Sequence, residues 1–148
     1  MYMESVPINY LAVVVSAVVM FALGGLWYGP LFGKPWMESM GWSPEKLKEM
    51  QAGGQKGMAL NYCLQAIGSL LMAFVLAHAL YFASTAMHVS GVPAGLMAGF
   101  WNWLGFIVPV TVGVVLWDGK PWKLWFINAG YYLVGLLCMG AILAIWTP

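Results

Sequence analysis

Uncharged polar side chains recur at helical spacing inside two long apolar stretches of the sequence. In residues 58–82, two amides and a hydroxyl follow an i, i+4, i+8 spacing, which places them on one face of a helix. Residues 124–146 carry a related polar stripe. Such groups either pair across helices as packing contacts or line a polar pocket between the second and fourth helices. The candidate pocket residues are Asn61, Gln65, Ser69, Asn128, Tyr131 and Tyr132.

Asp, Glu, Lys and Arg are absent from the four apolar stretches of the sequence. Ion relays and ion-coupled transport usually depend on charged residues within the membrane, so we expect no proton- or sodium-coupled transporter of the acidic-residue type. The stretches also lack paired carboxylates for acid–base catalysis. No P-loop, GxSxG, HExxH or CxxC motif is present. We therefore predict that the protein is not an enzyme and has no catalytic residues and no cofactor.

The two histidines, His78 and His88, are the candidates for a metal-binding or pH-sensing pair, with Met87 beside His88. Zinc sites normally have three or four ligands, and no carboxylate or thiol is near these histidines in the sequence. We interpret both as interfacial histidines and predict no metal site.

The composition indicates a membrane protein. Of 148 residues, 62% are hydrophobic and only 7% are charged, whereas a soluble domain carries roughly 25% charged residues. Most of the surface must therefore face lipid. Six lysines without arginine give no clustered basic face, so we predict no nucleic-acid partner. Cys63 and Cys138 fall inside apolar stretches, and we expect buried thiols without a disulfide.

Four apolar stretches, residues 8–28, 58–82, 93–117 and 124–146, are long enough to cross a bilayer in one membrane domain over residues 1–148. About 21 residues at about 1.5 Å each reach roughly 30 Å, the thickness of the hydrocarbon core. Aromatic and basic residues at the ends of the first and third spans are typical of anchors at the headgroup level. The expected anchors are Trp27, Lys34, Trp36, Trp117, Lys120 and Trp122.

The connections set the expected orientation. All six lysines lie in residues 29–57 and 118–123, and the other connection and both termini have none. The positive-inside rule predicts that these two connections are cytoplasmic and that both termini are outside. Within the first connection, Ser43-Pro44-Glu45 is typical of a helix start and predicts a short amphipathic helix.

The two halves of the chain resemble each other. A constant offset aligns residues 61–77 with 128–144, with an asparagine at the start of each, and Gly-Lys-Pro-Trp occurs at both 33–36 and 119–122. Each half contains two spans, so the repeats would be parallel. The alternative is that any two apolar hairpins look alike.

Small residues four apart let helices approach closely. They indicate either packing within one chain or a homodimer contact, and Pro109 predicts a kink in the third span. The pairs are Ala12/Ser16, Ala73/Ala77 and Gly95/Gly99.

The stretch Leu26-Trp27-Tyr28-Gly29-Pro30-Leu31-Phe32-Gly33-Lys34-Pro35-Trp36 resembles a bacterial membrane-protein family known as domain of unknown function 1761. Ile127-Asn128-Ala129-Gly130-Tyr131-Tyr132-Leu133-Val134, followed by Met139-Gly140-Ala141-Ile142-Leu143, is similar to the closing segment of that family. The resemblance covers nearly the whole chain. It implies a four-span integral membrane protein of a bacterial inner membrane and implies no activity.

The predicted fold is an all-α bundle of four transmembrane helices, built from two parallel-repeat hairpins, with a short amphipathic cytoplasmic helix in the first connection. We expect lipids and a second copy of the chain, as a dimer, to be its partners. Two functions remain open: binding or transport of a small neutral or lipophilic molecule, and a structural or accessory role on another membrane protein.

Overall fold

The computed structural model describes residues 6–53 and 55–147, and these ranges are helical with short connections and no β-strand. Four of its segments are long and apolar enough to cross a membrane: Tyr10–Leu31, Gly57–Met87, Gly91–Leu116 and Trp122–Ile145. The prediction of an all-α fold with four candidate spans is confirmed. The elements are α1 (Tyr10–Leu26), η1 (Trp27–Leu31), α2 (Gly33–Met40), α3 (Pro44–Ala52), α4 (Gln55–Met87), α5 (Gly91–Asn102), η2 (Trp103–Ile107), α6 (Val108–Thr111), α7 (Gly113–Leu116) and α8 (Trp122–Ile145).

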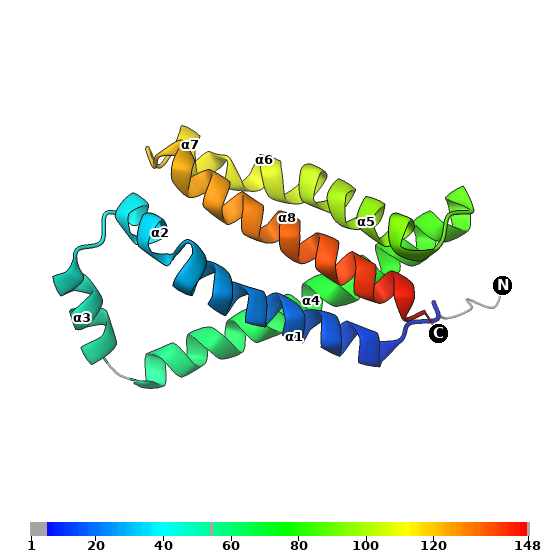
Figure 1. The fold of residues 1–148 in the computed structure, drawn as a ribbon, viewed down its shortest axis with the longest axis horizontal. Helices are drawn as coiled ribbons and strands as arrows, with labels where there is room; N and C mark the ends of the chain where they lie inside the picture. The colour runs from blue at the N-terminus through cyan, green and yellow to red at the C-terminus, as the bar shows by residue number, and fades with distance from the viewer. Residues whose placement is uncertain (1–5, 54, 148) are drawn as a thin grey trace.

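Helix α8 is the centre of the bundle, with α5 on one side and α1 on the other (Figure 1). Its contact with α5 is the most extensive in the molecule. Glycines allow this close approach, because a Cβ on Gly95 would lie 2.0 Å from the carbonyl oxygen of Gly140, and one on Gly99 would lie 2.5 Å from that of Leu136. The Gly95/Gly99 pair therefore packs within one chain, and the homodimer alternative for this pair is wrong.

The other small-residue pairs are also used inside the chain. Ala12 and Ser16 of α1, like Ala73 of α4, are fully buried, and Ala77 is nearly so. In each case a small side chain lets two helix backbones of the same chain approach closely. These positions are therefore covered within the chain and are not accessible to a second copy.

The first span does not end at Tyr28 but continues through a break. Five residues, Trp27–Leu31, form a π-helical turn in which Gly29 has non-helical angles (φ −101°, ψ −106°) and Pro30 lacks an N–H. The chain then forms α2, which the sequence analysis missed. Gly33 permits this compact turn, because a Cβ there would lie 2.6 Å from the carbonyl oxygen of Tyr28.

Helix α4 is longer than predicted, since it continues through residues that we assigned to the second connection. Thr85 donates its hydroxyl hydrogen bond to the Tyr81 carbonyl oxygen (2.9 Å), so its polar group is satisfied inside the helix. Only three residues, 88–90, separate α4 from α5. A helix of 33 residues is about 50 Å long and exceeds a bilayer core of roughly 30 Å.

The two ends of α4 differ in burial. From Ser69 onward the helix contributes Ser69, Ala73, Leu76 and Leu80 to the core, whereas residues 57–65 are all exposed. Cys63 is among the exposed residues, so the expectation that both thiols are buried is wrong for Cys63. The helix crosses the bundle at an angle, and its first half leaves the other helices (Figure 1).

The third span is interrupted where Pro109 predicted a kink. The π-helical turn η2 ends at Ile107, two residues before Pro109. Helices α6 and α7 are short segments separated at Val112. Both the first and the third span thus contain a π-helical turn.

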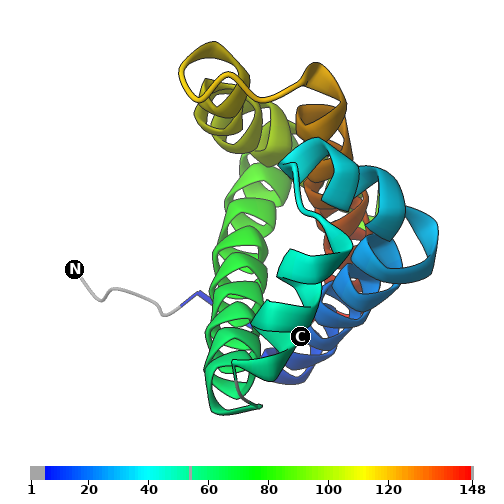
Figure 2. The same ribbon diagram turned by 90° about the vertical axis from the view of Figure 1, so that its left-hand side faces the viewer.

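Both lysine-bearing connections lie at the same end of the molecule. The ammonium group of Lys120 donates to the carbonyl oxygen of Met40 at 3.5 Å, and Lys123 forms an exposed ion pair with Glu38 at 3.8 Å. Figure 2, viewed from this end, shows α2, α3 and the connection before α8 nearest the viewer. We call it the lysine end.

Candidate functional site

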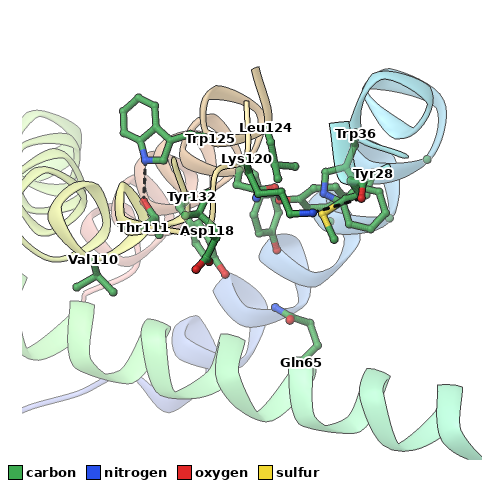
Figure 3. A pocket seen from close by; sticks show the side chains of 18 of the residues that line it. Tyr28, Trp36, Gln65, Val110, Thr111, Asp118, Lys120, Leu124, Trp125 and Tyr132 are labelled. Carbon is green, nitrogen blue, oxygen red and sulfur yellow. Dashed lines mark hydrogen bonds between the residues drawn. The ribbon is translucent and has the colours of Figure 1, made fainter. Parts of the chain in front are cut away.

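A cavity of about 1210 Å³ occupies the lysine-end half of the bundle. It is open to the outside, and its walls come from α1, η1, α2, α4, α6, α7 and α8. Four of the six candidate pocket residues line it: Gln65, Asn128, Tyr131 and Tyr132. Figure 3 shows Gln65 pointing from α4 into this space, with Tyr132 across from it.

The remaining two candidates do not line the cavity. Asn61 is exposed, and Ser69 is fully buried and donates to the carbonyl oxygen of Gln65 in its own helix at 3.0 Å. The three residues share a face of α4, but α4 diverges from the bundle along its length. The same face therefore meets the core at Ser69, the cavity at Gln65 and open surroundings at Asn61.

The wall opposite α4 is a hydrogen-bonded group of aromatic residues. The Tyr28 hydroxyl donates to Oδ1 of Asn128 at 2.9 Å, and the buried Tyr131 hydroxyl donates to the Met20 carbonyl oxygen at 3.1 Å. The Tyr131 ring lies with its centroid 5.2 Å from that of Tyr28 and 5.0 Å from that of Tyr132. Asn128 and Tyr131 thus make packing contacts and also line the cavity.

Two indole groups fix helix α8 where it lines the cavity. Trp27 donates to the carbonyl oxygen of Ile127 at 3.0 Å, and Trp103 donates to that of Ala129 at 2.8 Å. Each tryptophan is the first residue of a π-helical turn. Trp27 was predicted as an anchor at the headgroup level. Its partly buried ring packs against the core and against Gly130, whose missing Cβ makes room for it.

Two lining residues that were not among the candidates come from the interrupted third span and the start of α8. Trp125 donates its indole hydrogen to Oγ1 of Thr111 at 3.1 Å, and Thr111 donates to the Ile107 carbonyl oxygen at 2.7 Å (Figure 3). Pro109 was the sequence feature that could have identified Thr111. A proline in a span leaves nearby backbone carbonyl groups without a hydrogen-bond donor, and a threonine hydroxyl can donate to such a carbonyl.

The mouth of the cavity carries the only charged groups in its described lining, Asp118 and Lys120. Trp36 also borders this opening, with its ring centroid 5.3 Å from that of Tyr28. Lys120 and Trp36 were predicted as membrane anchors, and the structure places both at the cavity. Trp117 also lines the cavity and is exposed, and the remaining predicted anchors, Lys34 and Trp122, are exposed outside its lining.

The cavity is closed toward the opposite end of the bundle. Met20, Leu76 and Met139 are buried to 2% exposure or less and fill the bundle between this cavity and a second, smaller one of about 270 Å³ near the chain ends. The two cavities share no lining residue, and the larger one lies at the lysine end beside the exposed part of α4.

The histidines lie away from this site. Nδ1 of His78 is 2.8 Å from the carbonyl oxygen of Phe74 in the same helix, and His88 follows α4 with φ 54°. Among the described residues, no group of three His, Cys, Asp or Glu side chains is placed to hold a metal ion.

The chain is helical, with four segments long and apolar enough to cross a membrane and an open cavity lined in part by aromatic residues, features that suggest a small membrane protein. The family described as "Protein of unknown function (DUF1761)" matches residues 11–144, and the chain belongs to this family. Searches of curated proteins and of solved structures find no significant match.

Proposed function

We propose that the protein is an integral membrane protein that binds a lipophilic molecule without net charge in the cavity at its lysine end. The observation that carries this proposal is the cavity itself: its walls combine aromatic and aliphatic side chains with a few hydroxyl and amide groups. Binding sites for small molecules have this composition. The interrupted helices that form part of its wall are a second support, because broken spans often border substrate sites in membrane proteins.

The route into the cavity favours a ligand that arrives from lipid. Tyr62 of α4 and Val110 of α6 both line the cavity and are 57% and 76% exposed. In a bilayer these exposed positions face acyl chains. We therefore propose binding from the membrane, and we do not extend the proposal to transport through the bundle because the core closes the far end.

The proposed setting is a bacterial inner membrane with the lysine end in the cytoplasm and both termini outside. It rests on the six lysines, which the positive-inside rule places on the cytoplasmic side. We also propose that the chain forms a homodimer and retain the parallel repeat of two hairpins as a hypothesis. The small-residue pairs are no longer an argument for the dimer, since they pack inside one chain.

A second candidate is an accessory role on another membrane protein. It is favoured by the first half of α4, whose residues 57–65 are all exposed, and by α3, in which only Leu47 is partly buried. A partner that covers these surfaces would also cover one side of the cavity. Co-purification of one stoichiometric partner from membranes, together with absence of saturable ligand binding, would favour this role.

The test is photolabelling in lipid discs with a long-chain alcohol that carries a diazirine. We expect saturable labelling of peptides that contain Tyr62, Gln65 and Trp125, reduced by excess unlabelled alcohol. Gly25→Phe should abolish it, because Gly25 lines the cavity and a Cβ there meets nothing within 4 Å, so the ring fills the space without a backbone clash.

The matched control is Gly105→Phe. A Cβ at Gly105 also meets nothing within 4 Å, but Gly105 does not line the cavity, so labelling should persist. Labelling that is not saturable, or that is equally strong in Gly25→Phe, contradicts the proposal.

A further inference from the structure

Two opposite charges border the cavity from one short turn. Asp118 and Lys120 flank Gly119, whose φ of 66° is a left-handed conformation that glycine adopts without strain. The Lys120 backbone N–H donates to the carbonyl oxygen of Val114 at 3.2 Å and holds the turn. Both charged side chains line the cavity, and Figure 3 shows them extending into the same space.

The charges are kept apart. Lys120 reaches across to the carbonyl oxygen of Met40 on α2, whereas Asp118 lies on the side of Tyr132 (Figure 3). They do not form an ion pair with each other within 4 Å. A positive and a negative group therefore remain separately available at the mouth of one cavity.

Below these charges the lining becomes apolar and faces the lipid side. Phe21, Tyr62 and Val110 line the cavity, and all three are exposed. The volume of about 1210 Å³ exceeds the usual range of small-molecule pockets, about 300–1,000 Å³. The cavity thus has a charged end of both signs and a long, laterally open apolar part.

We propose that the ligand is a phospholipid with a zwitterionic headgroup, whose phosphate lies at Lys120 and whose ammonium group lies at Asp118, with acyl chain between α4 and α6. This inference rests on the proposed function and names its ligand class. The net charge of such a lipid is zero, and its two charges complement the two at the mouth.

Other lipid classes fit the mouth less well. An anionic lipid without an ammonium group brings negative charge next to the Asp118 carboxylate and leaves it without a partner. A diacylglycerol leaves both charges unpaired where a lipid displaces water from them. The zwitterionic lipid alone among these three classes satisfies both groups.

The experiment is native mass spectrometry of the full chain in an uncharged maltoside detergent. Phosphatidylethanolamine, phosphatidylglycerol and diacylglycerol with identical acyl chains are added at equal concentrations. We expect the protein to retain about two- to fivefold more phosphatidylethanolamine than either competitor, because partly exposed ion pairs strengthen binding by about this factor. Lys120→Gln should reduce the retained amount of both phospholipids to that of diacylglycerol. Asp118→Asn should make the retained amounts of the two phospholipids equal.

The controls are Lys123→Gln and Glu38→Gln, which alter the exposed pair outside the cavity and should leave retention unchanged. Equal retention of all three lipids by the wild type, or equal effects of Lys120→Gln and Lys123→Gln, overturns the headgroup assignment. If the headgroup assignment is overturned but Gly25→Phe loses retention of all three lipids, the proposed binding in the cavity still stands. If Gly25→Phe retains all lipids as the wild type does, both proposals fall.

Discussion

The indole N–H groups of Trp27 and Trp103 reach backbone carbonyls of α8 that already belong to a helix. Ile127 and Ala129 are two residues apart, so the two bonds approach α8 from nearly opposite sides. A carbonyl oxygen has two lone pairs and accepts the second bond without loss of the helical one. This arrangement fixes the part of α8 that forms the cavity wall.

We predict that Trp27→Phe and Trp103→Phe each lower the free energy of unfolding by about 0.5–1.5 kcal/mol, the net contribution of one hydrogen bond. Thermal unfolding in detergent measures the effect. Trp101→Phe is the control, because Trp101 is 60% exposed, and its melting temperature should match the wild type. Equal effects of all three substitutions would show that ring size, not the hydrogen bonds, matters.

Two buried serines should respond in opposite directions to alanine. Ser16 Oγ is fully buried and has no hydrogen-bond partner among the described residues, whereas Ser69 donates to Gln65. An unpartnered buried hydroxyl costs free energy, so we predict that Ser16→Ala raises the melting temperature and that Ser69→Ala lowers it. Loss of stability in Ser16→Ala would contradict this prediction.

The contact between α5 and α8 is the tightest association of two elements, and glycines set it. We predict that Gly95→Ala destabilises the protein by about 1–3 kcal/mol, the usual cost of overpacking, because the new Cβ collides with the Gly140 carbonyl oxygen. Gly105→Ala adds the same methyl group where nothing lies within 4 Å, and it should leave stability unchanged or slightly higher. Denaturant unfolding in detergent measures the free energy of unfolding of both variants. A Gly95→Ala protein as stable as the wild type would contradict the close α5–α8 contact.

The four spans were predictable from the sequence because they depend on the length of apolar stretches alone. Helix α2 was not predictable from the sequence, because residues 33–40 contain a glycine, a proline and charged side chains, which do not favour a helix locally. This helix is stabilised by its packing on η1 and α8. The cavity was predictable only in part. The spacing on α4 identified Gln65, but the angle at which α4 leaves α1 depends on tertiary contacts, which decided that Asn61 lies outside and Ser69 inside.

Both lysine-bearing connections lie at one end of the whole molecule, so we expect them on one side of the bilayer. We predict that single cysteines at Lys48 and Lys123, in a chain in which Cys63 and Cys138 are replaced by alanine, resist a membrane-impermeant maleimide in intact cells and react after lysis. A cysteine at Ser90 should react in intact cells. Opposite behaviour of the Lys48 and Lys123 positions would contradict the arrangement of the bundle.

The most direct test of the central claim is a crystal structure grown from a lipid mesophase that contains phosphatidylethanolamine brominated in its acyl chains. We predict an anomalous bromine signal inside the cavity, between Tyr62 on α4 and Val110 on α6, with headgroup density near Asp118 and Lys120. Bromine signals confined to the outer surface, with the cavity filled by side chains of this chain or of a second copy, would contradict it.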